Sequence, residues 1–172
     1  MRTVMRRKNR AMKTPGEMED LLGKMRVGRL AMSTEEGPYA VAVNYIFWEG
    51  RIYFHSALEG RKIEALRADP RVCFEVDDIG PQVLWDQGCG ISQIYRSVIC
   101  FGKAEFVEGA AEKRRILEAM VREFVPARCS ARPLREENVD RTAVIRIDIE
   151  SMSGKANAFS PSLHTLITRD CG

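Results

Sequence analysis

The feature that most constrains the fold is a run of three strand-like segments joined by very short turns. Segments 27–33, 39–47 and 51–56 carry the side-chain pattern of strands, and the second places apolar residues on one face and small or polar residues on the other. Residues 35–38 (Glu-Glu-Gly-Pro) and 48–50 (Trp-Glu-Gly) separate them, and such short connections have no room for a helix. The sequence therefore predicts an antiparallel meander.

Further strands are expected at 71–76, 95–107 and 145–150, the last of which alternates isoleucine with charged residues. Gly102 interrupts the second of these strands and indicates a bulge or a sharp bend, as in a small barrel. Residues 77–94 show no regular period and predict a long loop. Strands that arrive mostly in succession indicate a mainly β fold, because a parallel nucleotide-binding sheet would alternate strands with helices.

Three helices are expected around this sheet. Residues 14–17 (Thr-Pro-Gly-Glu) form a capping box ahead of the first helix. Residues 60–69 and 110–125 show helical spacing of their apolar side chains, and Pro70 ends the former segment.

The length of 172 residues suits one domain, with a basic N-terminal arm at 1–13 and an aperiodic C-terminal tail at 155–172. The 27 basic and 24 acidic residues are too balanced to indicate a nucleic-acid partner. No apolar run suits a membrane span or a secretory signal, so a cytoplasmic location is expected. Five cysteines without close spacing and two histidines predict free thiols and no metal site.

The candidate chemistry lies where the strand at 51–56 leads into the helix that begins at residue 60. Arg61 and Lys62 occupy the first helical turn, where their charges are unfavourable because the helix end already carries partial positive charge. A bound anion would explain both, since backbone N–H groups, an arginine fork and a lysine charge together bind phosphate, and Ser56 adds a hydroxyl donor. The alternative is that both side chains extend into water, and the local sequence leaves both interpretations open.

The preceding strand offers a surface for a flat ring. Ala40, Ala42 and Asn44 leave one face of it small, so that a ring could approach the backbone closely and receive a hydrogen bond from Asn44. Tight packing against another element explains the same residues equally well. His55 either contacts such a ring or is an ordinary packed strand histidine, and spacing alone favours the second interpretation.

The chain contains, in order along nearly its whole length, five recognisable blocks: MRRKNRAM, VGRLAMSTEEGPYAVAVNYIF, RIYFHSALEGRKIEALRADPRVCFEV, YRSVICFGKAEFVE and SMSGK. Together they resemble the pyridoxamine 5′-phosphate oxidase-like FMN-binding superfamily, and within it the branch related to 5-nitroimidazole resistance proteins. The third block is the most specific of the five.

The resemblance implies a six-stranded antiparallel split β-barrel with peripheral helices, which forms a homodimer with FMN at the subunit interface. It gives Ser56, Arg61 and Lys62 the phosphate role, and it places His55 beside the flavin as the functional residue. The other implied cofactor contacts are Ala42, Val43 and Asn44 on the strand beneath the ring, and Tyr95, Arg96 and Ser97 from the second subunit.

The function expected from this resemblance is a flavin-dependent reductase of small organic acceptors, with nitroimidazole-type nitroaromatics as a candidate class. A non-catalytic flavin-binding or flavin-sensing module, and the same barrel with haem or a deazaflavin, are alternatives, since a fold does not fix a function. The C-terminal tail lacks a counterpart of the arginine and histidine pattern of true pyridoxamine-phosphate oxidases, so vitamin B6 oxidation is not expected. Trp85 and Cys89 lie where selectivity could be set, and the sequence assigns them no role.

Overall fold

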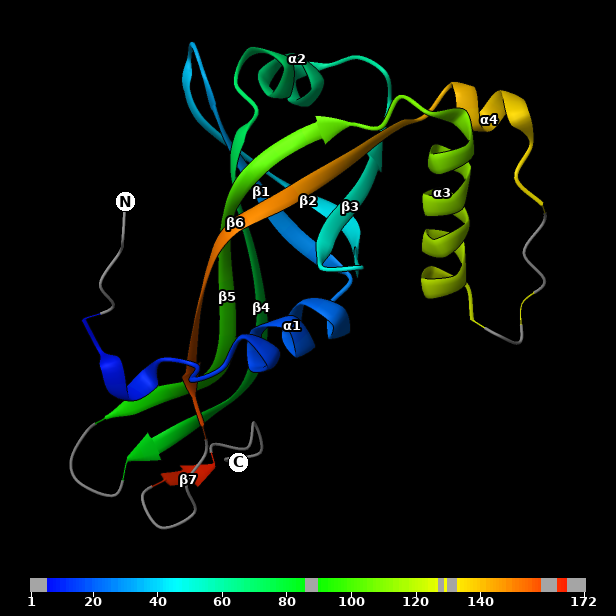
Figure 1. The fold of residues 1–172 in the computed structure, drawn as a ribbon. Helices are drawn as coiled ribbons and strands as arrows, with labels where there is room; N and C mark the ends of the chain where they lie inside the picture. Colours follow the sequence, from blue (N-terminus) through cyan, green and yellow to red (C-terminus); the bar gives the residue numbers. More distant parts are fainter. Residues whose placement is uncertain (1–5, 86–89, 127–128, 130–132, 159–163, 167–172) are drawn as a thin grey trace, which may run out of the picture.

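The computed structural model describes residues 6–85, 90–126, 129, 133–158 and 164–166. Six strands form a closed ring in the order β1-β2-β3-β6-β5-β4, and the pairing of β1 with β4 closes it (Figure 1). All of these pairings are antiparallel, which confirms the expected six-stranded barrel with peripheral helices. The elements are η1 (Lys8–Arg10), α1 (Pro15–Lys24), β1 (Val27–Thr34), β2 (Gly37–Trp48), β3 (Arg51–Ser56), α2 (Arg61–Ala68), β4 (Arg71–Trp85), β5 (Ile91–Phe106), α3 (Ala110–Phe124), α4 (Glu136–Asp140), β6 (Ala143–Asn157) and β7 (His164–Leu166).

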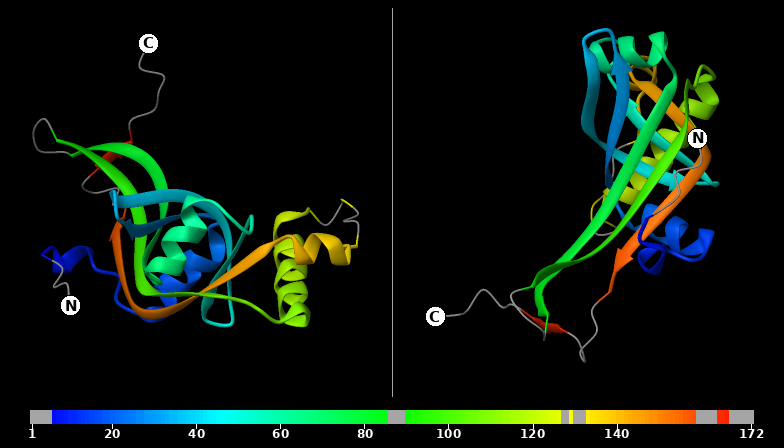
Figure 2. Two further views of the ribbon diagram at one scale, coloured as in Figure 1. Left: turned by 90° about the horizontal axis from the view of Figure 1, so that it is seen from above. Right: turned by 90° about the vertical axis from the view of Figure 1, so that its left-hand side faces the viewer.

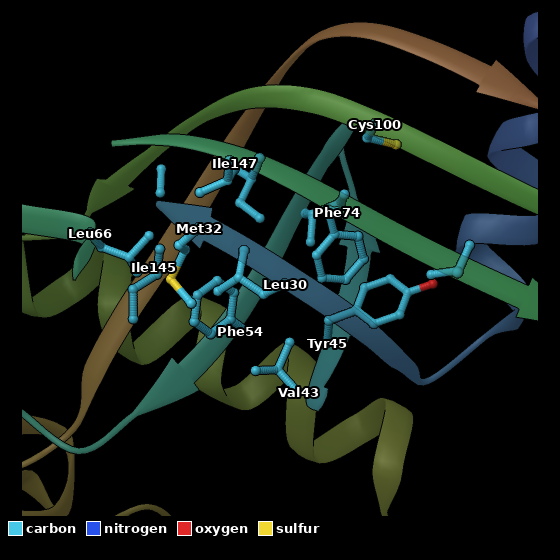
Figure 3. Packing of buried hydrophobic residues seen from close by; sticks show 14 of the residues in the cluster. Leu30, Met32, Val43, Tyr45, Phe54, Leu66, Phe74, Cys100, Ile145 and Ile147 are labelled. Atoms are coloured by element: carbon cyan, nitrogen blue, oxygen red, sulfur yellow. The ribbon is translucent and has the colours of Figure 1, made fainter. Parts of the chain in front are cut away.

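The inner faces of the strands fill the barrel with apolar side chains (Figure 3). Phe74 and Tyr45 are fully buried and meet edge to face, with ring centroids 4.9 Å apart. The Tyr45 hydroxyl donates a hydrogen bond of 2.7 Å to the carbonyl oxygen of Leu22, so its one polar group is satisfied inside the core. Gly28 lies directly beneath the Phe74 ring, which occupies the space that a Cβ would need.

The helices cover different parts of this barrel. The predicted N-cap is confirmed at α1, where Thr14 Oγ1 accepts a hydrogen bond from the Glu17 N–H. The returning bond of the capping box is shifted by one residue, since Glu17 Oε2 accepts from the Lys13 N–H instead of the Thr14 N–H. Helix α3 stands beside the barrel (Figures 1 and 2) and packs its apolar stripe on the outward-facing Ile46 and Tyr53 of β2 and β3. No helix in the described ranges is long and apolar enough to cross a membrane.

The prediction of a long loop at 77–94 is wrong. Strands β4 and β5 run through most of this segment as one hairpin, which extends well beyond the barrel (Figure 2). Alternating burial on β5 begins only at Val98, where the strand enters the barrel. Among the described residues of the extension only Val83 is buried, so no two-residue period of burial runs along it, and the register shift between Ile79 and Gln82 disturbs the pattern further.

The C-terminal tail also differs from the expectation, since it is not aperiodic after Gly154. Strand β6 continues to Asn157, whose side-chain amide donates hydrogen bonds to Ser92 and Gln93 toward the tip of the extension. The short β7 then pairs with β4, and the short helix α4 precedes β6. Cys89 falls outside the described residues.

The bulge predicted at Gly102 is confirmed. The register between β5 and β6 shifts between Phe101 and Gly102, and the backbone of Asp148 and Ile149 lies so close to Gly102 that a Cβ would overlap the Asp148 carbonyl oxygen. The barrel therefore bends here because the residue has no side chain.

We expect Gly102→Ala to destabilise the fold by about 2–4 kcal/mol, because the new methyl group must push two strands apart. Gly23→Ala is the matched control, since this helical glycine has open space around its Cβ position and the change should be neutral or slightly stabilising. Urea unfolding followed by far-UV circular dichroism measures both variants. Equal midpoints for Gly102→Ala and the wild type would contradict this account of the bend.

Candidate functional site

The junction between β3 and α2 creates an anion-binding geometry. Strand β3 ends at Ser56, and helix α2 begins after Gly60, whose φ of 110° favours glycine. The first helical hydrogen bonds run from the N–H groups of Ile63 and Glu64 to the Gly60 carbonyl, and no side chain caps the helix. The N–H groups of the first turn are therefore open to a ligand at the positive end of the helix.

Lys62 and His55 lie together on the β3 side of this junction. The Lys62 ammonium sits over the Phe54 ring at 5.6 Å from its centroid, and partial burial lowers the pKa of Lys62. Burial, and then the positive charge of Lys62, lower the pKa of His55, so its imidazole is neutral at pH 7. In the described part of the chain no carboxylate pairs with Lys62, which leaves a half-buried cation for an anion to meet.

Arg61 points elsewhere. Its guanidinium lies over the Tyr39 ring at 4.5 Å from the centroid and forms a 2.7 Å ion pair with Glu36 on the β1–β2 turn. Both partners of this pair are at least half exposed, so the ion pair is weak and can be exchanged for another anion. The structure thus brings Lys62 close to His55, places Ser56 at the end of the same strand, and directs Arg61 toward the β1–β2 turn.

The outer face of β2 has the small, open surface that the sequence predicted. Ala42 and Asn44 are exposed on it, whereas Val43 is buried with its side chain in the barrel core. Val43 can therefore meet a ligand only through its backbone. Asn44 and His55, on neighbouring strands, both reach the same cavity of about 380 Å³.

Tyr95, Arg96 and Ser97 are remote from this junction. Ser56 pairs with Ala143 at the start of β6, whereas Ser97 pairs with Lys155 near its end. The two partners are twelve steps apart along β6 and are therefore separated by up to about 40 Å at a rise of roughly 3.3 Å per residue. Arg96 forms a 2.5 Å ion pair with Asp78, and Lys155 lies over the Tyr95 ring. Within one copy of the chain, these three residues therefore lie far from the β3–α2 junction.

The wall of the cavity was missed by sequence reasoning. The apolar stripe of α3 predicts only core packing, yet part of it lines the cavity. The sequence feature that could have indicated this wall is the width of the apolar stripe on α3. Val121 and Phe124 extend the stripe beyond the residues that pack fully against the barrel. In the described ranges no group of three or more metal-ligating side chains is found. The cavity is lined by Asn44, His55, Leu117, Met120, Val121, Phe124, Val125, Leu134, Asn138 and Thr142.

Three solved structures illustrate what the chain is similar to. A protein named for 5-nitroimidazole antibiotic resistance, from Bacteroides thetaiotaomicron, is 26% identical with a TM-score of 0.73, over 91% of this chain and 87% of that one. An FAD-binding protein from Mesorhizobium loti is 26% identical with a TM-score of 0.65, over 87% and 98% of the two chains. The flavocytochrome Anf3 from Azotobacter vinelandii shares the fold at 20% identity, with a TM-score of 0.82 over 97% and 76%.

No curated protein sequence matches the chain significantly. A family model described as pyridoxamine 5′-phosphate oxidase matches residues 14–156, which include the whole barrel, the β3–α2 junction and the outer face of β2. The chain therefore belongs to the pyridoxamine 5′-phosphate oxidase-like family.

Proposed function

We propose that this chain binds FMN and works as a flavin-dependent oxidoreductase of small organic acceptors. The observation that carries the proposal is the β3–α2 junction, where an uncapped helix start carries a half-buried Lys62 without a carboxylate partner in the described part of the chain, and where β3 ends at Ser56. This combination suits a phosphate monoester, because phosphate accepts several charge-assisted hydrogen bonds at once. In the proposed complex, the Arg61 guanidinium exchanges its ion pair with Glu36 for an ion pair with the phosphate.

The ring of the cofactor fits the outer face of β2. Ala42 is small and exposed, so a flat ring can lie against the backbone of Ala42 and Val43, with the Asn44 amide at its edge. His55 lies beside Asn44 on the neighbouring strand β3, and both residues line the same cavity. Bound flavin would supply hydride or single-electron transfer, and the neutral imidazole of His55 offers one donor and one acceptor nitrogen to the ring or to the second reactant.

The separation of Tyr95–Ser97 from the junction supports a homodimer. If this segment contacts the cofactor, it does so from a second copy, because the same segment in one copy lies at the opposite end of β6. An interfacial site would also exclude water from the ring. We therefore propose two equivalent sites per dimer, each built from the junction of one copy and β5 of its partner.

Nitroaromatic compounds are the acceptor class that we favour, and the similarity to the protein named for 5-nitroimidazole resistance supports it. A flavin-binding module without turnover is the alternative. Reduction of the bound flavin by a nicotinamide donor, followed by reoxidation with a nitroaromatic compound, would support the enzyme over the module.

Haem is a second candidate ligand. Anf3 is named a flavocytochrome, and His55 beside a mainly apolar wall is a side chain that could ligate haem iron. The cavity of about 380 Å³ is too small to enclose a whole tetrapyrrole, so flavin is the cofactor that we favour. An absorption spectrum of the purified protein distinguishes the two, since haem gives one intense Soret band and flavin gives two broad bands in the near-UV and blue.

We expect Arg61→Ala with Lys62→Ala to weaken FMN binding by roughly 3–6 kcal/mol, about a hundredfold to ten-thousandfold, because two charge-assisted phosphate contacts are lost. Arg67→Ala, at an exposed position in the last turn of the same helix, is the control and should bind FMN like the wild type. Isothermal titration with FMN measures all three proteins. Wild-type affinity in the double variant would refute the phosphate assignment.

Replacing Lys62 should also change the titration of His55. We expect Lys62→Met to raise the pKa of His55 toward its ordinary value of about 6.5, since a nearby positive charge is removed, while Arg67→Met leaves it unchanged. Proton NMR of the flavin-free protein follows the two histidines.

Because His55 has a lower pKa in the folded state than in the unfolded state, the unfolded state takes up the proton first as the pH falls. The wild type should therefore lose stability relative to His55→Gln as pH falls below about 6.5.

Mixed dimers test the shared site directly. A dimer that combines one Arg61→Ala, Lys62→Ala copy with one Arg96→Ala copy should retain one intact site and bind one FMN, whereas each parent dimer binds FMN weakly at both sites. Two different affinity tags isolate the mixed dimer, and its flavin absorbance gives the stoichiometry. If all contacts came from a single copy, the mixed dimer would have no intact site.

A further inference from the structure

The cavity beneath α3 has an apolar wall and a polar rim. Six of its lining side chains are apolar, and four carry neutral hydrogen-bonding groups. The cavity volume of about 380 Å³ lies at the small end of the range for ligand pockets, which suits a molecule of one or two rings. The apolar members are Leu117, Met120, Val121, Phe124, Val125 and Leu134, and the polar members are Asn44, His55, Asn138 and Thr142.

The polar rim can recognise a ligand directionally. The Thr142 hydroxyl donates a 2.6 Å hydrogen bond to the Asn138 carbonyl oxygen, which fixes that corner of the cavity. The side chains of Asn44 and Asn138 are exposed, and that of His55 is partly shielded at the cavity but still open to solvent. Among the described residues none of these three side chains forms a hydrogen bond. They therefore retain their full capacity to pair with groups on a ligand.

Contacts at both ends hold the wall in place. Near the start of α3, Arg115 lies over the Trp48 ring at 4.6 Å from its centroid and pairs with Glu49 on the β2–β3 turn. Near its end, Glu123 forms a 2.5 Å ion pair with Arg26 beside β1. The ion pairs of Arg115 and Glu123 therefore hold α3 against the barrel at two points along the helix.

We propose that this cavity binds the second reactant, a neutral and mainly apolar aromatic molecule with hydrogen-bonding substituents, and that Val121 and Phe124 determine the size that it accepts. The inference rests on the proposed function for the identity of the occupant as the flavin's reaction partner. Phe124 and the thioether of Met120 favour aromatic faces, and Asn44 and His55 place the polar substituents next to the position proposed for the flavin ring.

The experiment measures binding of nitrobenzene to the flavin-loaded protein by perturbation of the flavin absorbance. Val121→Trp fills the cavity from its partly exposed side, and we expect at least a tenfold loss of nitrobenzene affinity with FMN affinity unchanged. Arg122→Trp places the same side chain on the exposed face of α3 and should alter neither affinity. The anionic 4-nitrobenzoate should bind at least tenfold more weakly than nitrobenzene, because its carboxylate would lose water against an apolar wall.

Phe124→Ala provides a second test that removes atoms from a partly exposed position, so it remains informative where Val121→Trp fails to fold. We expect it to raise the affinity for 1-nitronaphthalene relative to nitrobenzene by about tenfold. An unchanged ratio, or tighter binding of 4-nitrobenzoate than of nitrobenzene, would overturn the proposal. Loss of FMN binding in Val121→Trp would show that the flavin itself fills the cavity, which overturns this inference and leaves the proposed function intact.

The two hypotheses fail in different ways. If the wild type takes up no FMN, the proposed function fails, and saturation-transfer NMR of the flavin-free protein still measures nitrobenzene in the cavity. Saturable binding that Val121→Trp abolishes supports the cavity assignment in that case too. No saturable binding of nitrobenzene to either form refutes it.

Discussion

The pairing of β1 with β4 is the interaction on which the rest of the structure depends. Residues 29–31 pair with residues 73–75 and join strands that are separated in sequence by β2, β3 and α2. The pairing turns an open sheet into a ring, so that no barrel edge is left to pair with another chain. It also brings Phe74 over Gly28 and against Tyr45, at the centre of the core. A side chain at Gly28 would occupy the same space as the Phe74 ring.

Closure of the barrel decides which surfaces remain for function. Because the inner faces are filled by apolar side chains, a ligand meets the outside of the barrel, and the outer face of β2 and β3 with the helix ends beside it offers such a surface. Helix α2 follows β3 directly and supplies its positive end, whereas α3 comes from a distant part of the sequence and supplies an apolar wall. His55 lies between the two, with a cation on one side and hydrocarbon on the other, and both lower its pKa.

Charge pairing distinguishes Lys62 from the other cations discussed here. Arg26, Arg96 and Arg115 form exposed ion pairs with carboxylates, which contribute little stability individually but locate helices and strands relative to one another. Lys62 is half-buried over an aromatic ring instead, where a cation loses part of its hydration. A ligand phosphate would offset that loss of hydration. The partial burial of Lys62 therefore costs stability in the free protein and favours binding of an anion.

The sequence by itself determined the barrel strands, the capped first helix, the bulge at Gly102 and the position of Ser56, Arg61 and Lys62 where β3 leads into α2, because each leaves a local trace in periodicity, turn residues or charge. Only the tertiary structure decided that residues 77–94 continue as a hairpin, that Arg61 and Lys62 point to different sides, and that α3 walls a cavity around His55. Alternation of apolar and polar residues indicates that one face of a strand is buried, so a strand that leaves the barrel loses this pattern. Which segments distant in sequence pack against each other cannot be recognised from any one segment.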